Sequence, residues 1–410
     1  MKKTPYILLL STLLFLLGSC GEDRWPAYYE YTADNLWMDS LMRKYYLWEE
    51  DMPAFKELTS QYFATNNDFL SVVKNEDDEI TSVDSLDTFK PGYGMDYRLL
   101  KLSDEEDIYA ALVTYVEPNS PAGKAGIERG TWIMQVDGNG LTSENSSTFL
   151  SDGKDHLLTM GLYNEEIDEE GNRTIYITSY AYAPLGAKEI YEREDVPYSN
   201  VLKKGNITVG YLLCNRFTGE TSELISLSNE FASEGVNEVV LDLRYNTNST
   251  LDGMALLASI LAPSSALGKT LATMKYNSKK HPEWPASYTL NTPSGGSNLN
   301  LTTLYVLTSS KTKGIAEHLI NCLKPYMNVV IIGGTTMGES YATQVFDNET
   351  FGLQFRLVTA VVSDADGVEA NFSGFSPDVS ASETSDLTKV LPFGDAEEAL
   401  LSVALKKMTE

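Results

Sequence analysis

The stretch over residues 308–341 constrains the fold of this chain more than any other. It reads as the end of a strand, a polar turn, a helix, an apolar strand and a second turn. Strands and helices alternate in the same way from about residue 187 onward. The predicted strands cover residues 207–213, 238–243, 304–307 and 329–332, and the predicted helices cover residues 221–234 and a segment after Leu251. This alternation predicts an α/β layer with crossover helices.

Two turns in this stretch resemble those of a known family. Active tail-specific (C-terminal-processing) serine proteases have S-A-S-A-S-E at the helix entrance and F-G-K-G after the next strand. Alignment on Glu317 and on Gly338 places the family's nucleophilic serine at Gly314 and its general-base lysine at Glu339. Gly314 has no side chain, and the Glu339 carboxylate therefore has no aligned hydroxyl to activate. The resemblance implies the protease core of that family over residues 187–406, with a degenerate catalytic dyad.

The segment D-L-R-Y-N-T at residues 242–247 resembles the D-L-R-x-N-x-G-G turn of the same family. In active members the glycines present a backbone N–H to the carbonyl oxygen of the substrate. In this chain the corresponding residues are Asn248 and Ser249. Loss of glycine hinders a positive φ, although asparagine adopts it more readily than most residues. The resemblance implies an altered oxyanion turn in which Asp242 and Arg244 persist as structural anchors.

Hydroxyl groups just upstream offer an alternative nucleophile. Ser309 and Ser310 could attack, with Lys311 or Lys313 as the base of a rearranged site. A misplacement of about 1 Å can cost ~10²-fold in rate, however. We expect the two lysines to be solvated on a polar turn, and Thr312 to be a helix N-cap or a turn residue.

Residues 90–165 resemble a PDZ domain. S-P-A-G-K-A-G-I-E-R-G at residues 120–130 fits the short helix and turn of that domain, and W-I-M-Q-V-D-G at residues 132–138 fits the strand and hairpin that follow. A PDZ groove binds an extended C-terminus as an added strand, while backbone N–H groups of a glycine-containing loop hold its carboxylate. Gly92, Tyr93, Gly94 and Met95 occupy the position of that loop. The alternative is a structural turn in a domain that serves only as a spacer.

Two further segments flank these parts. Residues 25–88 carry apolar and aromatic residues at spacings of three and four, which predicts short amphipathic helices with Asp34-Asn35 as a candidate N-cap. This helical N-terminal domain is expected to pack on its neighbours instead of folding alone. Residues 166–186 begin as an acidic stretch and continue as a strand, which suggests a hairpin insertion.

The N-terminus reads as a secretory signal over residues 1–20. Lys2 and Lys3 precede an apolar run that is too short to span a bilayer. The run ends in L-G-S-C, and a small-residue site ending in Cys20 resembles a bacterial lipobox. We therefore expect a lipoprotein of the bacterial cell envelope, anchored to a membrane through Cys20 and facing the periplasm or the cell surface. The alternative is a soluble secreted protein in which Cys20 has no role.

Charge and residue content exclude several classes of partner. The formal net charge of −27 opposes binding to nucleic acid. The chain has no CxxC motif and its three histidines are scattered, so we expect neither a metal site nor a cofactor. Cys214 and Cys322 have apolar neighbours, which fits either a disulfide or two buried thiols.

These observations predict a multidomain α/β protein with an N-terminal helical segment, a PDZ domain and a core of the tail-specific protease type. The favoured hypothesis is a non-catalytic lipoprotein that binds peptide or protein C-termini through its PDZ domain and a vestigial protease cleft. One alternative is an active serine-type endopeptidase with a rearranged Ser/Lys site. The other is a lipoprotein whose groove is unused.

Overall fold

The computed structural model describes residues 25–58, 63–86, 91–102, 106–167, 173–218, 222–247, 249–279 and 281–410. The predicted signal with Cys20, and Asn248 of the predicted oxyanion turn, lie outside these ranges. The chain divides into two compact units. One comprises Met1–Leu86 with Gln344–Val358, and the other comprises Asp87–Thr343 with Thr359–Glu410. None of the helices in the described ranges combines the length and the apolar character that a bilayer span requires.

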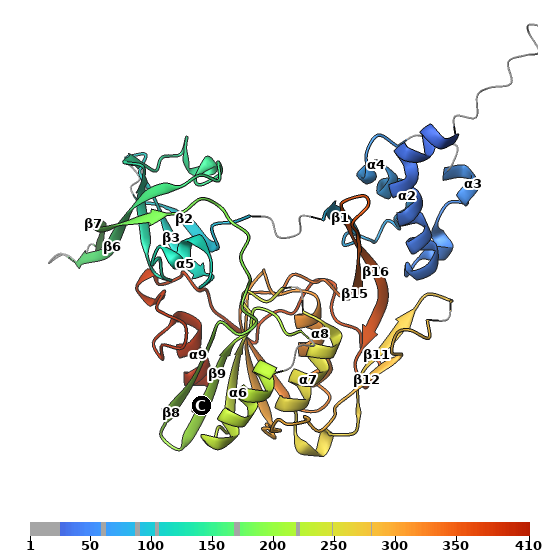
Figure 1. Ribbon diagram of the computed structural model, residues 1–410. Helices are drawn as coiled ribbons and strands as arrows, with labels where there is room; N and C mark the ends of the chain where they lie inside the picture. The colour runs from blue at the N-terminus through green and yellow to red at the C-terminus, as the bar shows by residue number, and fades with distance from the viewer. Residues whose placement is uncertain are drawn as a thin grey trace, which may run out of the picture. The chain divides into compact units, whose positions relative to one another are not determined.

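The first unit packs helices against a strand that returns from the C-terminal part of the chain. Its elements are α2 (Trp25–Tyr45), η1 (Glu49–Asp51), α3 (Phe55–Leu58), α4 (Asn66–Val73) and β1 (Ser82–Ser85), and β1 pairs antiparallel with β16 (Leu353–Ser363) (Figure 1). Trp37 of α2 meets Phe355 of β16 edge-on, with the ring centroids 6.0 Å apart. The helical segment thus packs on a neighbour from distant sequence.

The predicted N-cap at Asp34-Asn35 is wrong, because both residues lie inside α2, which already begins at Trp25. The Asn66 Nδ2 group at the start of α4 donates to Asp34 Oδ2 at 2.6 Å and to Asn35 Oδ1 at 3.1 Å. The two side chains therefore serve a contact between helices, which the local pattern does not reveal.

The second unit contains the predicted α/β layer. Its six strands are β8 (Tyr198–Lys204), β9 (Ile207–Leu213), β10 (Glu238–Asp242), β13 (Thr303–Thr308), β14 (Asn328–Gly333) and β17 (Val379–Ser380), in the order β17-β14-β13-β10-β9-β8. Neighbouring strands are parallel except β8 and β9. The prediction of alternating strands and helices is confirmed.

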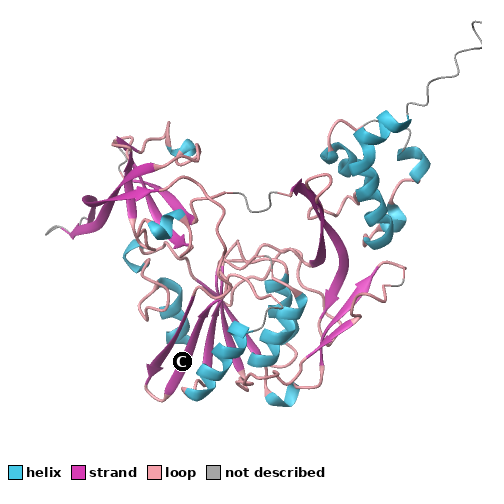
Figure 2. Ribbon diagram, in the orientation of Figure 1, coloured by secondary structure: helices cyan, strands magenta, loops and turns pink. Residues whose placement is uncertain are grey.

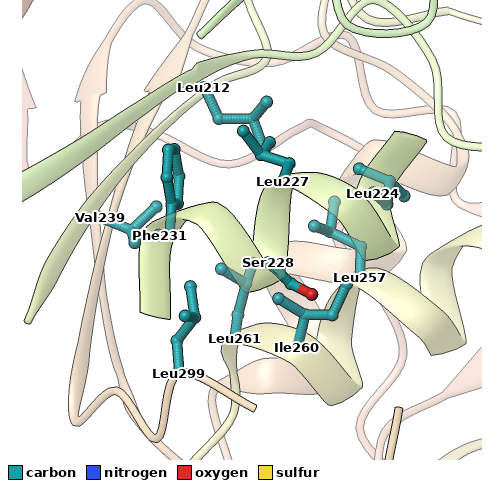
Figure 3. A pocket seen from close by; sticks show the side chains of 10 residues that line it. All are labelled: Leu212, Leu224, Leu227, Ser228, Phe231, Val239, Leu257, Ile260, Leu261 and Leu299. Carbon is teal, nitrogen blue, oxygen red and sulfur yellow. The ribbon is translucent and has the colours of Figure 1, made fainter. Parts of the chain in front are cut away.

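Helices cover both faces of this sheet. The helices α6 (Ser222–Ser233), α7 (Leu251–Leu261) and α8 (Ile315–Leu323) share one apolar core with it, and α9 (Ala399–Lys407) shares another on the opposite face (Figure 2). Apolar side chains of β9, β10, α6 and α7, among them Leu212, Phe231 and Leu257, surround a small cavity in the first core (Figure 3). Cys214 and Cys322 are both buried and free, so the two thiols do not form a disulfide.

A second six-stranded sheet precedes the α/β layer. It contains β2 (Met95–Lys101), β3 (Tyr109–Val116), β4 (Trp132–Val136), β6 (His156–Ile167) and β7 (Arg173–Leu185) in the order β2-β3-β4-β6-β7, and β5 (Asn139–Gly140) pairs with β4. The short α5 (Pro121–Lys124) and η2 (Ser146–Thr148) lie in its connections. We refer to this part as the β2–β7 sheet.

The predicted hairpin over residues 166–186 is present, but it begins earlier than predicted. Its first strand is β6 (His156–Ile167), so the predicted boundary at residue 165 falls inside a strand. The strands β6 and β7 pair from His156 opposite Leu185 to Ile167 opposite Arg173. Leu158, Ala183 and Leu185 are buried in the core of the β2–β7 sheet. The hairpin is therefore the last part of this sheet, because its apolar side chains complete the core.

Further strands were not predicted. Within the second unit, β11 (Thr270–Tyr276) pairs antiparallel with β12 (Ser287–Thr289) and with residues 360–363 of β16. The strand β15 (Tyr341–Asn348), which pairs with β16, lies mostly in the first unit. The remaining short helices are η3 (Ser264–Ala266) and η4 (Leu387–Lys389).

Candidate functional site

The predicted nucleophile position lies at the entrance of α8, just after the carboxyl end of β13. Gly314 is the N-cap residue of α8, with φ 59° and ψ −121°. A Cβ atom placed on Gly314 would meet the Glu339 Oε2 atom at 3.4 Å, which is an ordinary van der Waals contact. The two positions that the family alignment assigns to nucleophile and base are therefore neighbours in space. Gly314 leaves room for a side chain, although its positive φ is strained for any residue except glycine.

Gly338, unlike Gly314, leaves no room for a side chain. A Cβ atom on Gly338 would lie 2.3 Å from the carbonyl oxygen of Phe372, and its φ is +92°. The turn that carries Glu339 thus requires glycine for steric reasons.

The Glu317 carboxylate joins the two turns. Glu317 is fully buried. Its Oε2 accepts the Gly314 N–H at 3.1 Å, and its Oε1 accepts the Gly338 N–H at 2.7 Å and the hydroxyl of Thr336. Burial raises the pKa of Glu317, and the hydrogen bonds that it accepts oppose that rise. Glu317 thus caps the N-terminus of α8, and its contact with the Gly338 N–H links this end of the helix to the turn that carries Glu339.

The base position itself carries an ion pair. Lys313 Nζ lies 2.8 Å from Glu339 Oε1, and the two side chains are 24% and 17% exposed. The expectation that Lys313 is a solvated turn residue is therefore wrong. Lys313, which precedes the predicted nucleophile position, instead forms a partly buried ion pair with the carboxylate at the predicted base position.

The fallback nucleophiles have other partners. Ser309 Oγ donates to the Arg244 carbonyl at 2.6 Å and accepts the Lys311 N–H at 3.1 Å. Thr312 is buried, and its hydroxyl donates to the Leu243 carbonyl at 2.8 Å and accepts the Ser309 N–H at 3.0 Å. Both hydroxyls therefore tie this turn to the end of β10. Thr312 is a turn residue and not the helix N-cap.

Ser310 and Lys311 point to a different surface. Ser310 is exposed. Lys311 Nζ lies 2.8 Å from Asp96 Oδ2 of β2 and 5.2 Å from the ring centroid of Tyr245. Lys311 thus contacts the β2–β7 sheet, so these two residues do not form a Ser–Lys pair.

Ser249 of the predicted oxyanion turn is held by side-chain contacts. Its hydroxyl accepts the Phe217 N–H at 3.1 Å and donates to Asn246 Oδ1 at 2.8 Å. Asn246 Nδ2 in turn donates to the Cys214 carbonyl at 2.9 Å. This part of the turn is anchored to the loop after β9.

A buried ionic cluster joins the β2–β7 sheet to the α/β layer. Glu398 Oε1 is 2.8 Å from Arg129 of the β2–β7 sheet and 2.8 Å from Arg244 of the α/β layer. Arg244 also pairs with Asp242 at 2.6 Å. Burial acts to raise the pKa of Glu398, but the two guanidinium groups outweigh burial and lower it. Asp242 and Arg244 are thus structural anchors, and Arg129 extends their network to the second sheet.

The glycine loop predicted to hold a carboxylate precedes β2. Gly94 has φ +74°, and a Cβ atom on it would lie 2.0 Å from Ser120 Cβ. The carbonyls of Tyr93 and Gly94 accept N–H groups of Ala122 at 2.9 Å and Glu117 at 2.7 Å. Among the described residues, neither the Tyr93 N–H nor the Gly94 N–H donates a hydrogen bond. The Gly92 N–H donates to the Glu189 carbonyl at 3.0 Å, so this end of the loop is paired with the segment after β7. The loop is thus held by the carbonyls of Tyr93 and Gly94 and by the N–H of Gly92, which leaves the N–H groups of Tyr93 and Gly94 as its two unpaired donors among the described residues.

Comparison with known proteins identifies the family. The model of "Peptidase family S41" matches residues 208–381, and that of "Peptidase S41 N-terminal domain" matches residues 33–89. A Bacteroides fragilis NCTC 9343 protein assigned to the S41 proteases has a crystal structure at 2.00 Å resolution. It is 37% identical to this chain, with 91% of this chain and 97% of the other covered and a TM-score of 0.82. The fold is that of a mixed α/β protease. The chain belongs to peptidase family S41.

More distant relatives share the fold or part of the sequence. The structure of the photosystem II D1 C-terminal processing protease covers 89% of this chain and 98% of its own, at 20% identity and a TM-score of 0.50. The carboxy-terminal processing protease CtpA of Bacillus subtilis (strain 168) is 25% identical over 306 residues, which are 73% of this chain and 58% of that protein. The carboxyl-terminal-processing protease of Picosynechococcus sp. is 22% identical over 252 residues, or 60% and 55% of the two chains. The chain spans little more than half the length of these two curated relatives.

Sequence reasoning missed two groups of residues at this site. The pair of Lys313 with Glu339 was missed because the two residues are 26 positions apart in the sequence and meet only in the folded chain. The cluster of Arg129, Arg244 and Glu398 had no local signal either, since its members are separated by more than a hundred residues and join only in the folded chain.

Proposed function

We propose that this S41 family member is non-catalytic and binds peptide or protein C-termini. The observation that supports the proposal is the proximity of Gly314 and Glu339, the two residues that the alignment places at the dyad positions. Gly314 offers no nucleophile, and Glu339, whose Oε2 would meet a Gly314 Cβ at 3.4 Å, is paired with Lys313. A serine peptidase of this kind needs a hydroxyl beside a neutral lysine, and neither group is present.

The alternative of an active peptidase with a rearranged Ser/Lys site finds less support. The Ser309 hydroxyl donates to a backbone carbonyl, and the ammonium groups of Lys311 and Lys313 each face a carboxylate. A general base must lie within hydrogen-bond reach of the hydroxyl that it deprotonates, and these two ammonium groups are directed at carboxylates instead. Ser310, the remaining candidate, lacks a lysine that is free to activate it.

The binding surface that we propose is the edge of β2, with the β2–β7 sheet acting as a PDZ domain. In the described part of the chain, β3 is the one strand that pairs with β2, so the other edge of β2 is open to an added strand. The loop of Gly92, Tyr93, Gly94 and Met95 lies at the start of that edge. Its N–H groups at Tyr93 and Gly94 can hold the terminal carboxylate of an antiparallel peptide.

Relatives with the same fold act on protein C-termini, as the names of the D1 and CtpA processing proteases state. A chain that has lost the dyad but kept the sheet edge would retain recognition without cleavage. The proposal also includes a lipid anchor on Cys20, with the protein attached to a membrane of the bacterial cell envelope and facing the periplasm or the cell surface. Replacement of Cys20 by alanine should then release the protein from the membrane fraction.

A fluorophosphonate probe tests the absence of a nucleophile. We expect no labelling of the full chain under conditions that label an active serine peptidase in the same reaction. Stoichiometric labelling at any serine, with peptide hydrolysis that is lost when that serine becomes alanine, would establish the active alternative and refute the proposal.

Peptide binding tests the second half of the proposal. A pool of decapeptides with randomised last residues and a free carboxylate should bind, and the same pool with amidated C-termini should not. Gly94→Ala should abolish this binding because its Cβ would clash with Ser120. Gly126→Ala is the matched control, since Gly126 has a similar φ of +71° and open space around a Cβ. Equal binding of both pools would refute recognition of the carboxylate. If neither pool bound, the alternative of a lipoprotein whose groove is unused would be favoured.

A further inference from the structure

The side chains of β2 alternate between two faces of the sheet. Met95, Tyr97 and Leu99 pack against the core of the β2–β7 sheet. Asp96 and Arg98 therefore point to the opposite face, because successive side chains of a strand alternate. A peptide that adds to the edge of β2 would present its own side chains to these two faces in turn.

The face that carries Asp96 and Arg98 is turned toward residues of the α/β layer. Asp96 is paired with Lys311, three residues before the nucleophile position, at 2.8 Å. The guanidinium of Arg98 donates one N–H to the hydroxyl of Thr384. In the described ranges, no carboxylate pairs with Arg98. The Asp96 charge is thus compensated, whereas Arg98 keeps N–H donors and a positive charge available to a ligand.

The loop geometry sets the register of a bound C-terminus. If the N–H groups of Tyr93 and Gly94 hold the carboxylate, the last residue of the peptide lies opposite Met95. Each preceding residue of an antiparallel strand then moves one position along β2. The penultimate residue lies opposite Asp96, and the residue three positions before the last lies opposite Arg98.

We propose that the chain selects C-termini with an acidic residue three positions before the last, which Arg98 binds. This inference rests on the proposed recognition of C-termini and names the class of peptide that is recognised. Opposite charges directly across two strands stabilise the pair, and like charges destabilise it. The pair lies at an exposed edge, so its effect on affinity is modest. It adds specificity to binding that the contacts with the terminal carboxylate provide.

The test is a scan with decapeptides of free carboxylate that carry alanine, glutamate or lysine at this one position. We expect the glutamate peptide to bind about threefold more tightly than the alanine peptide, and the lysine peptide about threefold more weakly. Arg98→Glu should reverse this order, because it reverses the sign of the charge opposite this position of the peptide. Lys101→Glu is the matched control. It makes the same change of charge on β2, but its side chain lies on the other face of the strand from Arg98.

The outcomes separate this inference from the proposed function. Binding of all three peptides with equal affinity, or an order that Arg98→Glu does not change, would refute the role of Arg98 while recognition of the carboxylate stands. Failure of every free-carboxylate peptide to bind would refute both. A charge preference that Lys101→Glu reverses as strongly as Arg98→Glu would also refute the assignment, since it would reflect the net charge of the chain.

Discussion

Lys313 Nζ lies 2.8 Å from Glu339 Oε1, so the predicted general-base position holds a carboxylate that is already paired with a lysine. The site thus contains a positive and a negative side chain, Lys313 and Glu339, next to Gly314. This arrangement makes the chemistry of the cleft testable by substitution, because the backbone that would present a nucleophile is still in place at Gly314.

Restoring both dyad positions should restore reactivity. We expect Gly314→Ser combined with Glu339→Lys to become labelled by a fluorophosphonate, because a Cβ at position 314 would lie 3.4 Å from the present Glu339 carboxylate and the two introduced side chains would therefore start from neighbouring positions. The ammonium of Lys313 would lower the pKa of the lysine introduced at position 339, which favours the neutral base. Each single variant should remain unlabelled and serves as the control.

The same substitution has a cost in stability. Gly314 has a φ of 59°, so Gly314→Ser should lower the free energy of unfolding by about 1–2 kcal/mol in a denaturant titration. A double variant that folds but stays unlabelled would show that the turn of Asn248 and Ser249 no longer offers donors to the oxyanion.

Glu317 should matter for the integrity of the cleft. Its carboxylate accepts the N–H groups of both Gly314 and Gly338, and glutamine would place an NH₂ group against one of them. We expect Glu317→Gln to lower the free energy of unfolding by about 2–3 kcal/mol. Glu339→Gln is the control, since Glu339 is partly exposed and its loss should cost less. An equal effect of the two variants in urea titrations would contradict the anchoring role of Glu317.

The junction of the β2–β7 sheet with the α/β layer should depend on Glu398. Glu398→Ala would remove the buried one of the two carboxylates that Arg129 and Arg244 share, and the partly exposed Glu383 would remain as the other. We expect this loss to lower the unfolding free energy by about 3 kcal/mol. The adjacent Glu397 is 73% exposed and pairs with Lys389 on the surface, so Glu397→Ala should leave the transition midpoint almost unchanged. Thermal and urea unfolding of the two variants make the comparison, and similar midpoints would show that the buried cluster is not required.

His318 should make the fold sensitive to acid. Burial in α8 lowers the pKa of His318 to about 4, from an ordinary value of 6.5. The unfolded chain therefore takes up a proton at higher pH than the folded one. The stabilisation is fully present above pH 6.5, and about 3 kcal/mol is lost as the pH falls toward 4.

His318→Leu tests this dependence because leucine cannot titrate. The unfolding free energy of the variant should fall less steeply than that of the unchanged chain between pH 6.5 and 4. His156→Gln is a control of opposite sign, since hydrogen bonds to Asp137 and Asp152 raise the pKa of His156 against its burial. Its stabilisation is present at low pH and is lost as the pH rises. If the unfolding free energies of the unchanged chain and of His318→Leu fell equally steeply between pH 6.5 and 4, the burial of a neutral His318 imidazole would be contradicted.

Local sequence alone determined the α/β layer, the order of its strands along the chain and the two turns that carry Gly314 and Glu339. These features follow from hydrophobic periodicity and from short motifs, in which every residue acts on its near neighbours. The departures from the family pattern are equally local, because a missing side chain at position 314 needs no structure to be recognised.

Only the tertiary structure decided what surrounds those positions. The pairing of Lys313 with Glu339, the two amides held by Glu317 and the contact of Lys311 with Asp96 all join residues from different turns. The same holds for β7, whose place in its sheet depends on the core that Leu158 and Leu185 share. Such contacts form between segments that are distant in the chain, so their partners are set by packing and by burial of charge, which no local pattern encodes.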